Sequence, residues 1–265
     1  FTGSDATGQK IYEAAAKGLK RVSMELGGKS PNIVFADADI EAAVRGATVG
    51  IFYGKGEVCA AGSRLLVDAS IKDEFLEKVA ARTKKMGVGD PLDPKTRFGA
   101  LSSKSHFERV LGYVETAKKE GATLLAGGGR ADVGTGKGYF IQPTVFGNVT
   151  PDMTIAKEEI FGPVLSVISV QDADEAFRVN NDVAYGLSSS IYTRDVNLGV
   201  EYFRAGIPCP FLEDESCSIY PDRPLICREY LVISPAENCS APTPEIIQRV
   251  PMPGSFMTSF AKLDG

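Results

Sequence analysis

Histidine is almost absent from this chain of 265 residues, because His106 is the only one. That scarcity nearly excludes catalysis by a cysteine–histidine pair. The surrounding segment, SKSHFERV, predicts an exposed helix face on which His106 has a solvated, structural role. A catalytic thiol in this chain would therefore need a carboxylate or a bound water to handle its protons.

Long apolar runs and basic stripes are also missing. No run approaches the roughly 18 residues that a membrane helix needs, and no signal peptide opens the chain. The net charge is −5, and lysine and arginine are dispersed along the sequence. We therefore predict a cytoplasmic protein with neither a membrane nor a nucleic-acid partner. Phe1 enters directly as a strand end, so we expect a fragment whose amino-terminal part is missing.

Cysteine is scarce along most of the chain and concentrated near its end. Cys59 stands alone, whereas the other four follow in the last part of the sequence: Cys209, Cys217, Cys227 and Cys239. In a reducing compartment, clustered cysteines favour metal binding over disulfides. An isolated cysteine is a candidate nucleophile, although a buried structural thiol is an equal alternative on this evidence alone.

The order of patterns along residues 1–206 predicts an α/β fold. The predicted strands include KRVSMEL, PNIVF, RLLVD, YFIQPTVF and GPVLSVISV. They alternate with predicted helices at residues 39–53, 71–86 and 105–120, and Ser4 is expected to cap a further helix that runs to Lys17. This alternation is typical of a largely parallel sheet. After residue 206 it gives way to an irregular segment rich in cysteine and proline, and we place a boundary at 206–208.

One thiol and one carboxylate offer a specific chemistry. Cys59 lies in GEVCAAGSR and Glu25 in MELGGK. A thiolate that adds to an aldehyde gives a hemithioacetal that expels hydride, and the remaining thioester needs water activated by a general base. These residues would supply the nucleophile and the base to make and then hydrolyse a thioester.

Four stretches together resemble the aldehyde dehydrogenase superfamily, in that family's order: FTGS at 1–4, MELGGK at 24–29, GEVCAAGSR at 56–64 and EEIFGPV at 158–164. The resemblance covers residues 1–206. It implies that Cys59 is the nucleophile and that Glu25 is the base. It also implies oxidation of a small-molecule aldehyde substrate to a carboxylic acid, with NAD or NADP as the cofactor, and homo-oligomers among full-length members.

The resemblance further implies a set of cofactor-binding residues: Gly3, Ser4 and Thr7 at the pyrophosphate, Leu26 and Gly27 near the nicotinamide, Glu159 on the ribose hydroxyls and Phe161 against the ring. A carboxylate at Asp5 would repel a nearby phosphate unless it pointed away. No residue is assigned to a metal. By this resemblance, residues 1–27 are a remnant of an NAD(P)-binding domain and residues 28–206 a catalytic domain.

Relative to that family, the chain lacks most of the dinucleotide fold and the segment with the asparagine of the oxyanion site. Loss of one oxyanion donor costs roughly 10²–10³ in rate. We therefore expect this polypeptide to be inactive or nearly so by itself.

Residues 207–265 resemble part of another family, the CxxCxxCC proteins, a proposed zinc- or iron-chelating group. The defining CxxCxxCC cluster is absent here. Because two incomplete families meet near residue 207, we expect a chimera with a cysteine-rich tail of different origin. Two alternatives to the enzyme remain: a metal chelator that uses the tail cysteines, and a non-catalytic α/β domain.

Overall fold

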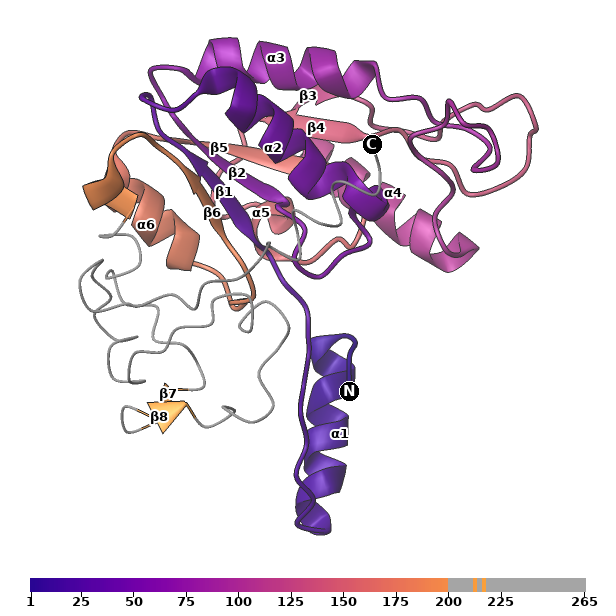
Figure 1. Cartoon of the computed structure of the whole chain (residues 1–265). Helices are drawn as coiled ribbons and strands as arrows, with labels where there is room; N and C mark the ends of the chain where they lie inside the picture. Colours follow the sequence, from indigo (N-terminus) through magenta and orange to yellow (C-terminus); the bar gives the residue numbers. More distant parts are fainter. Residues whose placement is uncertain (200–211, 214–215, 218–265) are drawn as a thin grey trace, which may run out of the picture. The chain divides into compact units, whose positions relative to one another are not determined.

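The computed structural model describes residues 1–199, 212–213 and 216–217 (Figure 1). The chain divides into two compact units, Phe1–Arg194 and Asp195–Gly265. Nearly all of the described residues belong to the first unit. In the described part of the chain, no helix is both long and apolar enough to cross a lipid bilayer.

A six-stranded sheet with the order β3-β4-β5-β2-β1-β6 forms the centre of the first unit. Neighbouring strands are parallel except for β3 and β4, which are antiparallel. The strands are β1 (Pro31–Val34), β2 (Arg64–Asp68), β3 (Thr123–Ala126), β4 (Thr144–Gly147), β5 (Val164–Val170) and β6 (Ser190–Tyr192). This confirms the prediction of an α/β fold with a largely parallel sheet.

The central strands are buried along almost their whole length because both faces of the sheet are covered. Every residue of β1 and β4 is buried, and β2 and β5 each have only one residue that is not. Continuous burial of this kind is typical of parallel sheets with helices on both sides. Figure 1 shows α2 and α3 lying side by side, and they contact each other.

The first unit contains the following helices, three of which begin at a side-chain cap. They are α1 (Asp5–Lys17), α2 (Ile40–Phe52), α3 (Lys72–Lys84), α4 (Lys104–Lys119), α5 (Thr154–Lys157) and α6 (Ala173–Asn181), with a 3₁₀ turn at Tyr53–Gly56. The side chains of Asp39, Ser103 and Asp172 accept hydrogen bonds from the first-turn amides of α2, α4 and α6. Such caps satisfy amides that a helix leaves without partners.

Some expected elements differ from the structure. The segment KRVSMEL at 20–26 is not a strand, because only Glu25 pairs, in a single bridge with Thr2. Of YFIQPTVF only the end, from Thr144, joins the sheet, while Ile141 makes an isolated bridge with Arg130. Ser4 occupies the cap position of α1, but its side chain accepts no hydrogen bond from a helix amide.

The region after residue 199 is described only in part. The backbone of two short antiparallel strands, β7 (Leu212–Glu213) and β8 (Ser216–Cys217), is assigned there. The expected irregular tail and Cys209, Cys227 and Cys239 lie outside the described residues. The boundary at 206–208 and the division into 1–27, 28–206 and 207–265 stay predictions.

Candidate functional site

The segment that carries Glu25 is held by the first residues of the chain. The amide of Glu25 donates to the carbonyl of Phe1 at 2.9 Å, and the amide of Gly3 donates to the carbonyl of Glu25 at 3.0 Å. These two bonds form the parallel bridge between Thr2 and Glu25. Two of the motifs singled out in the sequence, FTGS and MELGGK, therefore lie side by side.

Two successive amides extend this contact to further residues. The amide of Gly27 donates to Oδ1 of Asp5 at 2.9 Å, and the amide of Gly28 donates to Oε1 of Glu159 at 3.1 Å. The carboxylate of Asp5 is thus bonded to the Gly27 backbone. This gives Asp5 a structural partner that the sequence did not reveal. The bond from Gly28 to Glu159 brings EEIFGPV beside MELGGK.

The two glycines are needed because neighbouring atoms occupy the space of a side chain. A Cβ at Gly28 would lie 2.2 Å from the carbonyl oxygen of Cys59, and one at Gly27 would lie 2.6 Å from Oε2 of Glu159. Real Cβ atoms do not approach other atoms so closely. The backbone that follows Glu25 therefore packs directly against the backbone of Cys59, and all four motifs meet in one region.

Cys59 has a free, half-buried thiol. It follows the 3₁₀ turn and lies within a further turn, in which the amide of Ala61 donates to the carbonyl of Val58 at 3.0 Å. Glu57 holds the beginning of this segment: its Oε1 accepts from the amide of Ser102 at 3.0 Å. No hydrogen bond joins the Cys59 thiol to the Glu25 carboxylate, and both groups lie in the part of the chain that the structure describes.

Glu159 is a half-buried carboxylate whose pKa is raised, first by burial and also by the negative charge of Asp5. The bond from Gly28 and the charges of Arg109 and Lys29 oppose that shift. Two residues on, Phe161 has a left-handed backbone with φ of 56° and remains 37% exposed. A residue other than glycine is uncommon in this conformation, and such residues cluster at active sites and ligand-binding sites. The exposed ring is available for contact with another molecule.

The amine of Lys29 is a feature that sequence reasoning missed. Its side chain is 1% exposed, and within the described residues its Nζ has no hydrogen-bond partner. Burial and then the charge of Arg64 lower its pKa to about 7, against the attraction of Glu159 and Glu158. Lysine usually keeps its amine in water, so the sequence held no signal for this burial.

Arg64, at the start of β2, is equally buried and was also missed. Its guanidinium donates to the carbonyls of Lys29 at 2.8 Å, Val179 at 2.9 Å and Asn180 at 2.9 Å. The last two carbonyls belong to the end of α6, where helix carbonyls lack partners. Arg64 therefore fixes the MELGGK segment to α6.

His106 corrects the expectation of a solvated side chain. Its imidazole is only 11% exposed, and Nε2 lies 3.4 Å from Oε1 of Glu57. Its ring centroid is 6.1 Å from that of Phe161. His106 stands beside Phe107 at the edge of the apolar face of α4, where burial depends on the neighbouring segments.

The residues proposed for the cofactor phosphates lie at the amino-terminus of α1. Gly3, Ser4 and Thr7 are exposed, and the hydroxyls of Ser4 and Thr7 are 3.1 Å apart. The amino-terminus of a helix favours anions because its amides lack partners and its dipole is positive there. Leu26, next to Gly27, packs against α1, since a Cβ at Gly8 would meet its side chain at 2.6 Å.

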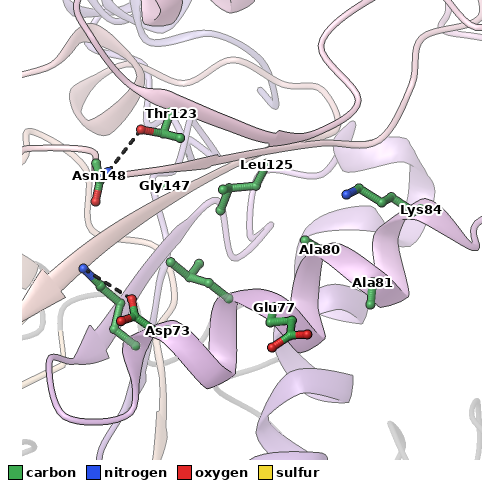
Figure 2. Close-up of a pocket in the computed structure, with 11 residues that line it drawn as sticks. Asp73, Glu77, Ala80, Ala81, Lys84, Thr123, Leu125, Gly147 and Asn148 are labelled. Atoms are coloured by element: carbon green, nitrogen blue, oxygen red, sulfur yellow. Dashed lines mark hydrogen bonds and ion pairs between the residues drawn. The ribbon is translucent and has the colours of Figure 1, made fainter.

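A surface pocket lies away from these motifs, between α3 and the edge of the sheet (Figure 2). Its volume is about 610 Å³, and Thr123 and Asn148 form a hydrogen bond of 3.1 Å at its rim. None of the candidate residues lines it. In the described part of the chain, no cluster of three or more His, Cys, Asp or Glu residues could hold a metal ion.

Comparison with known proteins places these motifs in a family context. Residues 1–205 match the model of the aldehyde dehydrogenase family, and residues 173–244 match that of the CxxCxxCC family, a proposed zinc- or iron-chelating domain. The two matches overlap, so they do not fix a boundary.

Curated relatives include the betaine aldehyde dehydrogenases of Rhizobium leguminosarum bv. trifolii and Brucella anthropi, which are 53% and 50% identical over 197 and 200 residues. These alignments cover 74% and 75% of this chain but 40% and 41% of the relatives.

Solved structures give the same result. The chain is similar to the NAD-dependent aldehyde dehydrogenase of Sinorhizobium meliloti, with 46% identity and a TM-score of 0.74 over 77% of this chain and 40% of that one. It is also similar to an aldehyde dehydrogenase of Bacillus cereus in complex with NAD⁺, with 44% identity and a TM-score of 0.74 over 76% and 40%.

Proposed function

The chain belongs to the aldehyde dehydrogenase family, and we propose from this membership that its site serves the NAD(P)-dependent oxidation of an aldehyde to a carboxylic acid. The observation that carries the proposal is the contact at Gly28, which joins the Glu25 segment to Cys59 and Glu159. Because the chain spans about 40% of the length of the curated relatives it matches, the activity of a whole enzyme remains a proposal for this chain.

Each proposed role follows from the chemistry of the residue. The thiolate of Cys59 adds to the aldehyde carbonyl carbon and leaves a thioester after oxidation. Glu25 takes a proton from the water that hydrolyses this thioester, and its backbone bonds to Phe1 and Gly3 fix its position. The Cys59 thiol is restored when the carboxylic acid leaves.

The residues present fit a nicotinamide cofactor. The half-buried carboxylate of Glu159 is suited to accept hydrogen bonds from ribose hydroxyls, and the exposed ring of Phe161 is suited to pack against the nicotinamide. Gly3, Ser4 and Thr7 at the start of α1 are suited to bind phosphate oxygens. When bound, the cofactor supplies the acceptor for the hydride. The Bacillus cereus relative has been solved as an NAD⁺ complex, which makes NAD the first cofactor to test.

The relatives' names make betaine aldehyde the first substrate to test. With NAD or NADP, we expect this chain alone to form no more NAD(P)H than its Cys59→Ser variant, because it spans only about 40% of the length of the relatives it matches. Turnover clearly above that variant would contradict the expected inactivity and would directly demonstrate the oxidation.

An activated ester tests the proposed residues without a cofactor, because it acylates a nucleophilic thiol directly. We expect p-nitrophenyl acetate to acetylate Cys59, measured by mass spectrometry of the tryptic peptide that spans residues 56–64 and contains no other cysteine. Glu25→Gln should accumulate the acetylated peptide because deacylation slows. If Cys59 stays unmodified while the other cysteines react, the proposed nucleophile is wrong.

The match to residues 173–244 favours a second candidate function, chelation of zinc or iron by thiolates. Its candidate ligands are Cys209, Cys217, Cys227 and Cys239, whose side chains lie outside the described residues. Metal-held thiols become reactive only when the metal is removed. Alkylation of these cysteines that needs a chelator, together with bound zinc or iron in the purified protein, would support this function; rapid alkylation without a chelator would exclude it.

A further inference from the structure

One face of α4 lies against residues 158–162, the segment that contains both proposed contacts to the nicotinamide ring and its ribose. The ring centroid of His106 is 6.1 Å from that of Phe161. The hydroxyl of Tyr113 donates to Oε2 of Glu158 at 2.7 Å. His106 and Tyr113 are about two helical turns apart, so they lie on the same side of the helix. This face of α4 therefore contacts the segment at two separate points.

Arg109 lies between these two contacts on the helix. Its Nη2 donates to the carbonyl of Ile160 at 3.2 Å. The next residue, Val110, packs against the same segment, because a Cβ at Gly162 would lie 2.7 Å from its Cγ2. The Ile160 carbonyl belongs to the peptide group that enters Phe161, whose φ of 56° is left-handed. The guanidinium therefore bonds the backbone directly before this uncommon conformation.

The charge of Arg109 also acts on Glu159, the residue before Ile160. Burial raises the pKa of Glu159, and the positive charge of Arg109 opposes that rise. Lys29 and the amide of Gly28 act in the same direction as Arg109. The guanidinium therefore favours the ionised carboxylate, which offers only acceptor oxygens to the hydroxyl donors of a ribose. Its bond and its charge are both directed at the same short segment.

We propose that Arg109 is a positioning residue for cofactor binding: its bond to the Ile160 carbonyl holds Glu159 and Phe161 in the orientation that contacts the nicotinamide ribose and ring. This inference rests on the proposed function, from which the roles of Glu159 and Phe161 are taken. Arg109 acts through the backbone of Ile160, 51 residues later in the chain, and lies outside all four of the motifs. It is therefore not a catalytic residue.

NMR titration of the Glu159 side-chain carboxyl tests the action of Arg109 on the segment. Arg109→Met removes the positive charge, so the pKa of Glu159 should rise. Arg109→Lys keeps the charge and should leave this pKa close to its wild-type value. Lys104→Met is the matched control and should also leave it unchanged, because it removes a positive charge from α4 at an exposed side chain that pairs with Glu108. An unchanged Glu159 pKa in Arg109→Met would contradict the proposal.

The backbone of Phe161 and the binding of NAD⁺ test the bond to Ile160. A left-handed residue brings its amide proton close to its own Hα, which gives a strong nuclear Overhauser effect between the two. This signal should be strong in the wild type and in Lys104→Met, and weaker in Arg109→Met, where the peptide before Phe161 is no longer held. Titration with NAD⁺, followed through the Phe161 ring signals, should give a dissociation constant about tenfold higher in Arg109→Met.

The outcomes separate this inference from the proposed function. If NAD⁺ binds the wild type and Arg109→Met with the same dissociation constant, the positioning role is wrong and the cofactor site stands. If the Glu159 titration and the Phe161 backbone both depend on Arg109 but NAD⁺ perturbs neither residue in the wild type, Arg109 holds the segment and the proposed cofactor contacts are wrong. If Arg109→Met does not fold, Arg109→Gln, which also removes the charge, takes its place with the same expected results.

Discussion

The carboxylate of Glu159 accepts a hydrogen bond from the amide of Gly28, a residue 131 positions earlier in the chain. The same Gly28 packs against the carbonyl of Cys59. One glycine therefore joins three segments that carry the proposed base, nucleophile and ribose ligand. Changes at this position should affect all three together.

Gly28→Ala tests this packing. The added methyl would collide with the Cys59 carbonyl oxygen, which cannot move without its backbone, so we expect a loss of about 2–4 kcal/mol in the free energy of unfolding. Gly112→Ala is the matched control, because Gly112 lies within α4 with no atom near its Cβ position. It should stabilise the protein by about 0.5–1 kcal/mol. Equal stability of the two variants in urea titrations would show that the glycine contact is not tight.

Because of Lys29, the free energy of unfolding should depend on pH in the alkaline range. Its pKa is about 7 in the folded protein and near its ordinary value in the unfolded chain, so between these values only the unfolded state holds the proton. Stability should therefore rise with pH, by roughly 2–3 kcal/mol between pH 7 and pH 9.5. Below pH 7 both states are protonated and the gain is absent.

Lys29→Met removes this titration, so its free energy of unfolding should no longer rise over that interval, and at pH 7 it should exceed that of the wild type. Lys104→Met, at an exposed lysine, should keep the wild-type rise. Parallel pH profiles for the wild type and Lys29→Met would show that the buried amine is not the cause.

Arg64→Lys should destabilise the protein although the charge is kept. A lysine amine cannot reach the three carbonyls that the guanidinium bonds, so buried acceptors lose their donors at a cost of about 2–4 kcal/mol. Arg82→Lys, at an exposed arginine bonded to Thr48, should cost less than about 1 kcal/mol. Thermal unfolding of both variants measures the difference, and similar losses would contradict the proposed anchor.

Asp5 should influence the charge state of Glu159. Its carboxylate raises the Glu159 pKa, so Asp5→Asn should lower that pKa while its amide oxygen still accepts from Gly27. NMR titration of the Glu159 side-chain carboxyl measures the shift. Asp73→Asn, at an exposed carboxylate on α3, is the control and should leave Glu159 unchanged. A Glu159 pKa that does not fall in Asp5→Asn would show that the two carboxylates do not interact.

The sequence predicted secondary structure best where the signal is local to the segment. The strand PNIVF and the helix begun by Asp39 follow from apolar periodicity and a cap, which are local properties. KRVSMEL was wrongly expected to be a strand because strand propensity does not create a partner, and only Glu25 finds one. The candidate motifs were identified by resemblance, and the structure brings their segments together.

The residues that sequence reasoning missed share one property: their environment is made by distant segments. Lys29 is buried where Arg64 of β2 bonds to its carbonyl and where the charges of Glu159 and Glu158 act on its amine. Arg64 finds the end of α6 more than a hundred residues later. His106 lies at the edge of an apolar helix face, where only the arrival of Glu57 and Phe161 determines its exposure.

The order of strands in the sheet also has a consequence for how this protein forms. β5 lies between β4 and β2, so the centre of the sheet pairs Arg64 with Ser166, about a hundred residues later. Contacts so distant in sequence close slowly, because a long loop must be ordered before they are made. During synthesis, Cys59 and its neighbours leave the ribosome well before Glu159 and Asn180, which hold the adjoining segment. Cys59 therefore spends the early life of each new chain without the segments that surround it in the folded protein.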